Sequence, residues 1–210
     1  MRATFLVIAT AALCGAFPAY AAAETHEDHT SFSVNAGSLA FAEAPALPTL
    51  SAVTLNGEAQ TTYTTMTSFK VRDATGSGSG WHVSVSGHEG AGLRPKFTQY
   101  CPEAACGTIG YVAGGSELPA NSLKLNSTGA SFEPATNAPS LECASGCYID
   151  TGNETANKIV SAAEHKGMGL YKAKGWGAES LQLSTPAELT TLPAHEVYRV
   201  DVLWTLSSGP

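Results

Sequence analysis

The sequence predicts an all-β protein, an antiparallel β-sandwich of the immunoglobulin-like or jelly-roll-like kind. Three observations lead to this prediction. Apolar and polar residues alternate with a period of two in several segments, which is typical of half-buried strands. The segments are short and are separated by residues that favour turns, among them 21 glycines and 11 prolines. Helical patterns, by contrast, are few.

The N-terminus has the pattern of a secretory signal peptide. Arg2 is its only charge, an apolar core runs from Phe5 to Leu13, and small residues follow up to Ala23. The apolar run is shorter than the roughly 20 residues that a membrane span needs. We therefore expect a secreted protein with no membrane insertion after cleavage. Residues 1–23 are the signal, residues 24–31 a polar leader and residues 32–210 one β-sandwich domain.

The acidic charge balance argues against two classes of partner, nucleic acid and anionic lipid. Without its signal peptide the chain holds ten basic and 18 acidic residues, a net charge of −8. Nucleic-acid binding depends on lysines and arginines that neutralise phosphates, and docking on anionic lipid has the same requirement. His26-Glu-Asp-His29 contains metal-ligand residue types, but a leader of eight polar residues is not expected to preorganise a site. We expect no nucleic acid, no metal and no other cofactor.

The first half of the domain contains four alternating segments. They are Phe32 and Val34; Leu39 and Phe41; Phe69 and Val71; and Trp81, Val83 and Val85. The run Gly76-Ser-Gly-Ser-Gly80 precedes the last of them. No Lys-Ser/Thr pair and no helix follow this run, so we interpret it as a turn and not as a phosphate loop. Asp73 is expected to cap this turn through an Asx-type hydrogen bond.

Residues 101–157 are predicted to be a loop-rich insertion pinned by disulfides. This stretch contains the four cysteines that remain after signal cleavage: Cys101, Cys106, Cys143 and Cys147. An even number of cysteines in an exported protein favours disulfides, and the short spacings favour the pairs 101–106 and 143–147. A zinc site is the alternative, but the usual two-residue gap between ligand cysteines is missing.

The C-terminal third adds three segments. Residues 155–166 fit either a helix or a strand, and we favour a strand from Lys158 to Ala162. Trp176, between two glycines, has no apolar neighbours two residues away, so it is the candidate for an exposed aromatic that contacts a ligand. Residues 198–206 alternate over nine positions and predict a strand whose apolar face includes Trp204 and Leu206.

No catalytic arrangement is recognisable. No Gly-x-Ser-x-Gly elbow lies on a strand-to-helix turn, and paired cysteines leave no thiolate nucleophile. We therefore expect no enzyme. A secreted hydrolase whose site is dispersed over several strands is the alternative, because catalytic groups can assemble from distant parts of a chain.

Two motifs together resemble the WxL domain of Gram-positive surface proteins. One is Gly80-Trp81-His82-Val83 behind Asp73-Ala-Thr-Gly76, and the other is Trp204-Thr-Leu206. Val83 stands where the family name expects leucine, and the cysteine loops are not part of the family pattern. Trp81, Val83, Trp204 and Leu206 lie on apolar strand faces, so we expect these motif residues in the core.

The resemblance implies a secreted, non-catalytic domain that attaches non-covalently to peptidoglycan in the cell wall. The sequence ends at Pro210 without an apolar span or a basic tail, which leads us to expect a standalone domain without a covalent anchor. The alternative is a structural or adhesive subunit that binds other surface proteins through strand edges or through the cysteine loops.

Overall fold

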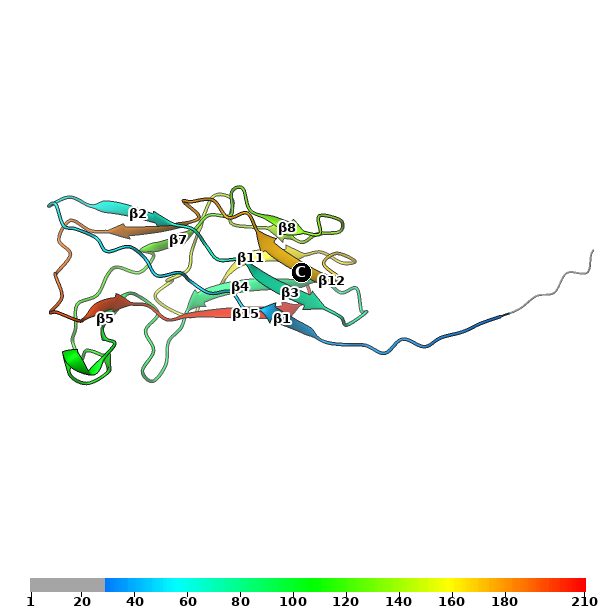
Figure 1. Ribbon diagram of the computed structural model, residues 1–210, viewed down its shortest axis with the longest axis horizontal. Helices are drawn as coiled ribbons and strands as arrows, with labels where there is room; N and C mark the ends of the chain where they lie inside the picture. The colour runs from blue at the N-terminus through cyan, green and yellow to red at the C-terminus, as the bar shows by residue number, and fades with distance from the viewer. Residues whose placement is uncertain (1–28) are drawn as a thin grey trace, which may run out of the picture. The chain divides into compact units, whose positions relative to one another are not determined.

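The computed structural model describes residues 29–210, and the chain forms the predicted all-β fold. The expected signal peptide and most of the polar leader lie outside the described residues. Residues 35–210 form one compact unit. The strands of this unit pair antiparallel in four sheets (Figure 1).

The four sheets have the following strands, given in their spatial order. Sheet A contains β1 (Leu39–Glu43), β3 (Phe69–Asp73), β12 (Gly169–Lys174) and β8 (Ser131–Glu133). Sheet B contains β10 (Cys147–Tyr148), β7 (Leu123–Leu125), β13 (Leu181–Thr185) and β2 (Gln60–Thr64). Sheet C contains β15 (Val202–Ser208), β4 (Trp81–Gly87), β11 (Asn157–Ala162) and β9 (Ser140–Leu141). The three-stranded sheet contains β14 (Val197–Arg199), β5 (Thr98–Cys101) and β6 (Gly110–Tyr111), and a short 3₁₀ turn, η1 (Ala104–Cys106), follows β5.

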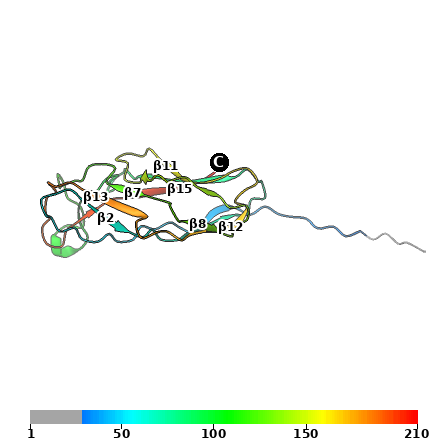
Figure 2. The same cartoon turned by 90° about the horizontal axis from the view of Figure 1, so that it is seen from above.

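Sheets A and C form two layers with the hydrophobic core between them. Figure 2 shows β11 and β15 of sheet C in one layer and β8 and β12 of sheet A in the other. Phe69 and Tyr171 of sheet A belong to the same buried cluster as Trp81 and Val160 of sheet C. The expected sandwich is therefore present, and β4 is an inner strand of sheet C, paired with β11 and β15.

The connection from β3 to β4 is the turn that the sequence predicted. The Oδ1 atom of buried Asp73 accepts hydrogen bonds from the backbone N–H of Thr75, at 3.1 Å, and from its hydroxyl, at 2.7 Å. Gly80 has a φ of 73°, and a Cβ there would collide with the carbonyl oxygen of Ala162. Glycine is therefore required at the point where the chain enters sheet C.

Two strand predictions need correction. Phe32 and Val34 form no strand, and 89% and 81% of their surfaces are exposed. Alternation was present, but a strand also needs a neighbour for its backbone groups. The closing strand is broken into β14 and β15, because the backbone N–H of Asp201 donates to the carbonyl of Arg94 instead of continuing one ladder.

The cysteine-rich stretch is loop-rich and contains both predicted disulfides. Cys101 pairs with Cys106, and Cys143 pairs with Cys147. The stretch is nevertheless not peripheral, because it supplies β7 to sheet B, β8 to sheet A and β9 to sheet C. Leu123, Leu125, Phe132 and Ile149 are buried in the common core.

A further prediction, the strand within residues 155–166, is confirmed as β11.

Candidate functional site

The two tryptophan motifs lie side by side in sheet C. Val83 on β4 is opposite Leu206 on β15, and Val85 is opposite Trp204. Trp81 and Val83 are completely buried, and the indole N–H of Trp81 donates to the carbonyl of Gly167 at 3.0 Å. Trp204 and Leu206 are half-buried against the same core. In this position the motif residues close the sandwich, and a ligand surface has to be sought elsewhere.

Trp176 is not the exposed aromatic that its local sequence suggested. Only 8% of its surface is exposed, and its ring stacks on Phe69 at a centroid distance of 6.3 Å. The flanking glycines gave no sign of this contact, because Phe69 lies more than a hundred residues away in the sequence. The structure therefore removes the reason for expecting a ligand contact at Trp176.

A cluster of aromatic and basic side chains lies on the three-stranded sheet, and we call it the Tyr–Arg cluster. It consists of Tyr100, Tyr111, Arg94 and Arg199 around Asp201. The two tyrosine rings meet edge to face at 4.9 Å. The Arg199 guanidinium lies 4.4 Å from the centroid of the Tyr100 ring, within the range of a cation–π contact.

Asp201 holds this cluster in place. Its carboxylate accepts hydrogen bonds from Arg199 Nη2 at 2.8 Å, from the Tyr111 hydroxyl at 2.6 Å and from the Arg94 backbone N–H at 3.0 Å. Burial and the hydrogen bond to Asp201 raise the pKa of Tyr111 well above its usual range. The Tyr111 hydroxyl therefore stays protonated and remains a donor at every physiological pH.

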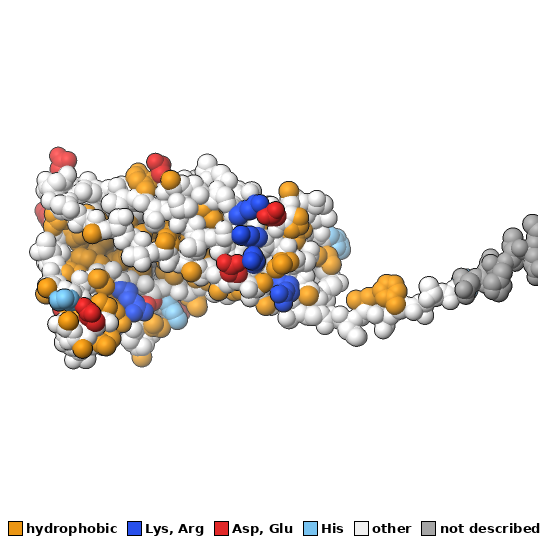
Figure 3. Space-filling model, in the orientation of Figure 1, with side chains coloured by type: hydrophobic (Ala, Val, Ile, Leu, Met, Phe, Trp, Pro, Cys, Tyr) orange, Lys and Arg blue, Asp and Glu red, His pale blue; other side chains and the backbone are white. Residues whose placement is uncertain are grey.

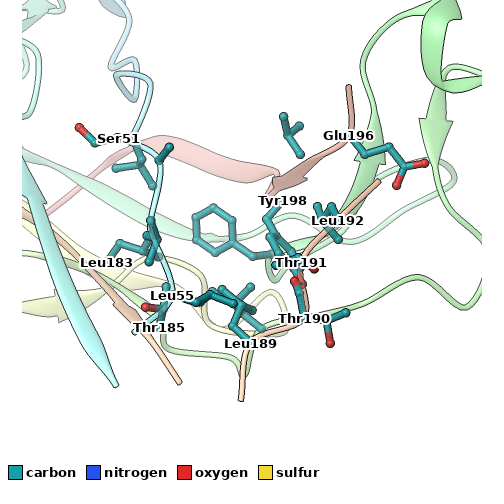
Figure 4. Close-up of a pocket in the computed structure, with 16 residues that line it drawn as sticks. Ser51, Leu55, Leu183, Thr185, Leu189, Thr190, Thr191, Leu192, Glu196 and Tyr198 are labelled. Atoms are coloured by element: carbon teal, nitrogen blue, oxygen red, sulfur yellow. Dashed lines mark hydrogen bonds between the residues drawn. The ribbon is translucent and has the colours of Figure 1, made fainter. Parts of the chain in front are cut away.

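An apolar groove adjoins the cluster. It has two neighbouring depressions of about 440 and 410 Å³, and both are lined by Leu50, Phe97, Val197 and Tyr198. Figure 4 shows the first depression, where leucine and threonine side chains converge and the Glu196 carboxylate lies at the edge. The Tyr198 hydroxyl donates to the carbonyl of Thr190 at 2.8 Å, which fixes one wall of the groove.

The first disulfide loop connects the cluster to the groove. Cys101 directly follows Tyr100, and Pro102 and Tyr100 both line the second depression together with Arg199. Glu103 of the loop lies against His195, with 2.9 Å between Oε1 and Nδ1. The bridge to Cys106 therefore limits the motion of the chain that carries Tyr100 and Pro102.

The chemistry of this surface suits recognition. It offers aromatic rings, guanidinium groups and an apolar floor, a combination that matches sugar rings and acidic peptides.

Within residues 29–210 no group of three or more His, Cys, Asp or Glu side chains could hold a metal ion. The described part of the chain also contains no helix long and apolar enough to cross a membrane.

Sequence reasoning did not find the Tyr–Arg cluster. Tyr100, Tyr111 and Arg199 come from three strands, and only strand pairing brings them together. The one available signal was the position of Arg199 on the polar face of the closing segment. That signal has little weight by itself, because most arginines are exposed.

Comparison with known proteins places the chain within a family. A family model described as "WxL domain surface cell wall-binding" matches residues 28–210, nearly the whole chain. Neither a curated protein nor a solved structure gives a match. The matched range includes both tryptophan motifs of sheet C and the three strands that carry the Tyr–Arg cluster.

Proposed function

Because the chain belongs to the WxL family of surface cell-wall-binding domains, we propose that it is secreted and binds peptidoglycan non-covalently and without catalysis. The family match supports a cell-wall-binding surface domain. The observation that supports peptidoglycan as the ligand is the Tyr–Arg cluster at the edge of an apolar groove.

Peptidoglycan offers two groups that this surface suits. Its sugar rings have apolar faces that can stack on the Tyr100 ring, and Pro102 extends the same surface. Its peptide stems carry carboxylates, which the guanidinium of Arg199 can bind with the N–H groups that do not face Asp201. Asp201 keeps Arg199 over the Tyr100 ring, so the surface is arranged before the ligand arrives.

Co-sedimentation with purified cell-wall sacculi tests this proposal. We expect the purified protein to pellet with sacculi at low salt and neutral pH. Tyr100→Ala and Arg199→Gln should each weaken binding about tenfold, a typical loss at an aromatic or arginine contact. Tyr63→Ala is the matched control, because Tyr63 is 47% exposed on β2 and does not belong to the cluster.

Two results would count against this function. Recovery of the unaltered protein entirely in the soluble fraction would exclude sacculus binding. Equal losses for Tyr63→Ala and Tyr100→Ala would remove the Tyr–Arg cluster as the contact. Co-purification with another surface protein, together with indifference to sacculi, would favour an adhesive subunit, for which exposed Ile109 beside the first disulfide loop offers a contact.

A further inference from the structure

Four basic side chains form a block on the outer face of sheet A, away from the Tyr–Arg cluster. Lys70 and Arg72 lie on β3, and Lys172 and Lys174 lie on β12. Figure 3 shows lysine and arginine side chains gathered in a band across this face. We call these four residues the basic block.

The strand register brings the four charges together. Lys70 lies directly opposite Lys172, and the alternation of each strand puts Arg72 and Lys174 on the same face. The residues between them, Val71 and Ala173, are completely buried. Like charges directly opposite each other destabilise a sheet by roughly 0.2–1 kcal/mol, and Glu43 opposite Lys70 and Glu133 opposite Lys172 offset part of this cost.

Acidic residues on the flanking strands neutralise only part of the block. Lys70 pairs with Glu43 at 3.0 Å, and Lys174 pairs with Glu133 at 2.5 Å. Arg72 and Lys172 have no ion pair within residues 29–210. The face therefore keeps a net positive charge in an acidic protein, and four of the ten basic residues that follow the signal peptide lie on it.

We propose that the basic block binds an anionic phosphodiester polymer of the cell wall. That this polymer belongs to the cell wall rests on the proposed function, but the charges of the basic block that would bind it do not depend on the Tyr–Arg cluster. Successive outward positions of a strand are about 7 Å apart, so the block presents a flat grid of charges. A chain with repeated phosphates can contact several of these charges at once and release its counterions, which a single small anion cannot do.

The decisive variant is Arg72→Gln combined with Lys172→Gln, because neither residue forms an ion pair within residues 29–210 and Glu133, which lies opposite Lys172, keeps its partner Lys174. Lys158→Gln combined with Lys166→Gln removes the same charge from exposed positions elsewhere and is the matched control. Soluble poly(glycerol phosphate) is the probe, and binding is measured over a range of salt concentrations. Melting temperatures of both variants check that the fold is intact.

Each lost contact should weaken binding about fivefold, since a basic residue near an anionic surface contributes roughly that much. We therefore expect a loss of about 25-fold in the Arg72/Lys172 variant, a shallower salt dependence, and little change in the control. Walls stripped of phosphodiester polymers with hydrofluoric acid should retain less protein than untreated walls. Vesicles of phosphatidylglycerol should bind less tightly than the polymer.

Several outcomes would overturn this inference. One is unchanged polymer binding by the Arg72/Lys172 variant, and another is an equal loss in the control, which would indicate net charge alone. Tighter binding to vesicles would assign the block to lipid. Sacculi stripped of phosphodiester polymers separate the two proposals. If the protein does not bind stripped sacculi but still binds the polymer, peptidoglycan recognition is contradicted, and the inference about the basic block stands.

Discussion

Trp81 combines three structural tasks in one side chain. Its ring is fully buried between the two layers, its indole N–H donates to the carbonyl of Gly167, and its backbone lies opposite Ser208 at the end of β15. Gly167 has a φ of 69°, and a Cβ there would meet the indole of Trp81 at 2.7 Å. The first tryptophan motif and the turn before β12 therefore depend on each other.

We expect Trp81→Ala to lower the free energy of unfolding by about 3–5 kcal/mol, since it leaves a large cavity. Trp81→Phe should cost less, because it keeps most of the volume and loses mainly the hydrogen bond to Gly167. Trp204→Ala should also cost less than Trp81→Ala, because Trp204 is only half-buried. Urea denaturation measures all three, and the reverse order for the two alanine variants would contradict this account.

Asp150 makes the stability depend on pH. Its completely buried carboxylate accepts the backbone N–H groups of Ser122 and Leu123, both at 2.8 Å, where β7 begins. Burial raises its pKa from 3.8 to about 6. The folded protein therefore holds this proton more tightly than the unfolded chain does. The corresponding stability is fully present below pH 3.8 and is lost as the pH rises through 6.

The loss should amount to about 3 kcal/mol, since each pKa unit corresponds to about 1.4 kcal/mol. Asp150→Asn cannot ionise and should lose this part of the pH dependence. The measurement is the free energy of unfolding of both proteins in urea at several pH values from 3.5 to 7. The difference between them should change most between pH 4 and 6, and parallel curves would show that Asp150 does not titrate as described.

At the scale of elements, alternation predicted the strands that have long apolar faces. Residues 69–71 and 81–85 form β3 and β4 because every second side chain there enters the core. Strands of two or three residues, such as β6, β9 and β10, are too short to show any period. Alternation also does not identify the strand that pairs with a given segment. It therefore could not show that Phe32 and Val34 form no strand, or that the closing segment divides into β14 and β15.

The candidate site was less predictable than the strands. The two cysteine pairs followed from their short spacings and from the expected secretion of the protein. The Tyr–Arg cluster depends on contacts between β5, β6 and β14, and the basic block depends on the register of β3 against β12. Neither register is visible in a single sequence.

The two disulfides should differ in their effect on wall binding. Replacing Cys101 and Cys106 together by serine should lower stability by about 2 kcal/mol, the loop-closure entropy of so short a loop, and should also weaken sacculus binding. Replacing Cys143 and Cys147 is the control, because that loop lies outside both depressions of the groove. Co-sedimentation checks the prediction. Equal losses in the two variants would mean that only stability changed.

At the scale of the whole molecule, four sheets share a single core. Leu123 and Leu181 of sheet B belong to the same buried cluster as Phe69 of sheet A and Trp81 of sheet C. The chain also passes repeatedly between sheets, since β3 and β4, and β14 and β15, are consecutive strands of different sheets. No sheet can therefore lose its packing without exposing apolar surface of another, and we expect residues 35–210 to unfold in one transition.

Leu123→Ala tests this coupling. The substitution removes a buried side chain of sheet B and should cost about 2–5 kcal/mol. If residues 35–210 unfold as a single cooperative unit, the substitution should lower the midpoint of urea denaturation by the same amount whether unfolding is followed by tryptophan fluorescence or by circular dichroism. All three tryptophans, Trp81, Trp176 and Trp204, lie outside sheet B, so fluorescence reports on parts of the core that sheet B does not supply. Two separated midpoints would instead show that sheet B unfolds independently, and the groove beside it could then open while the tryptophan motifs remained folded.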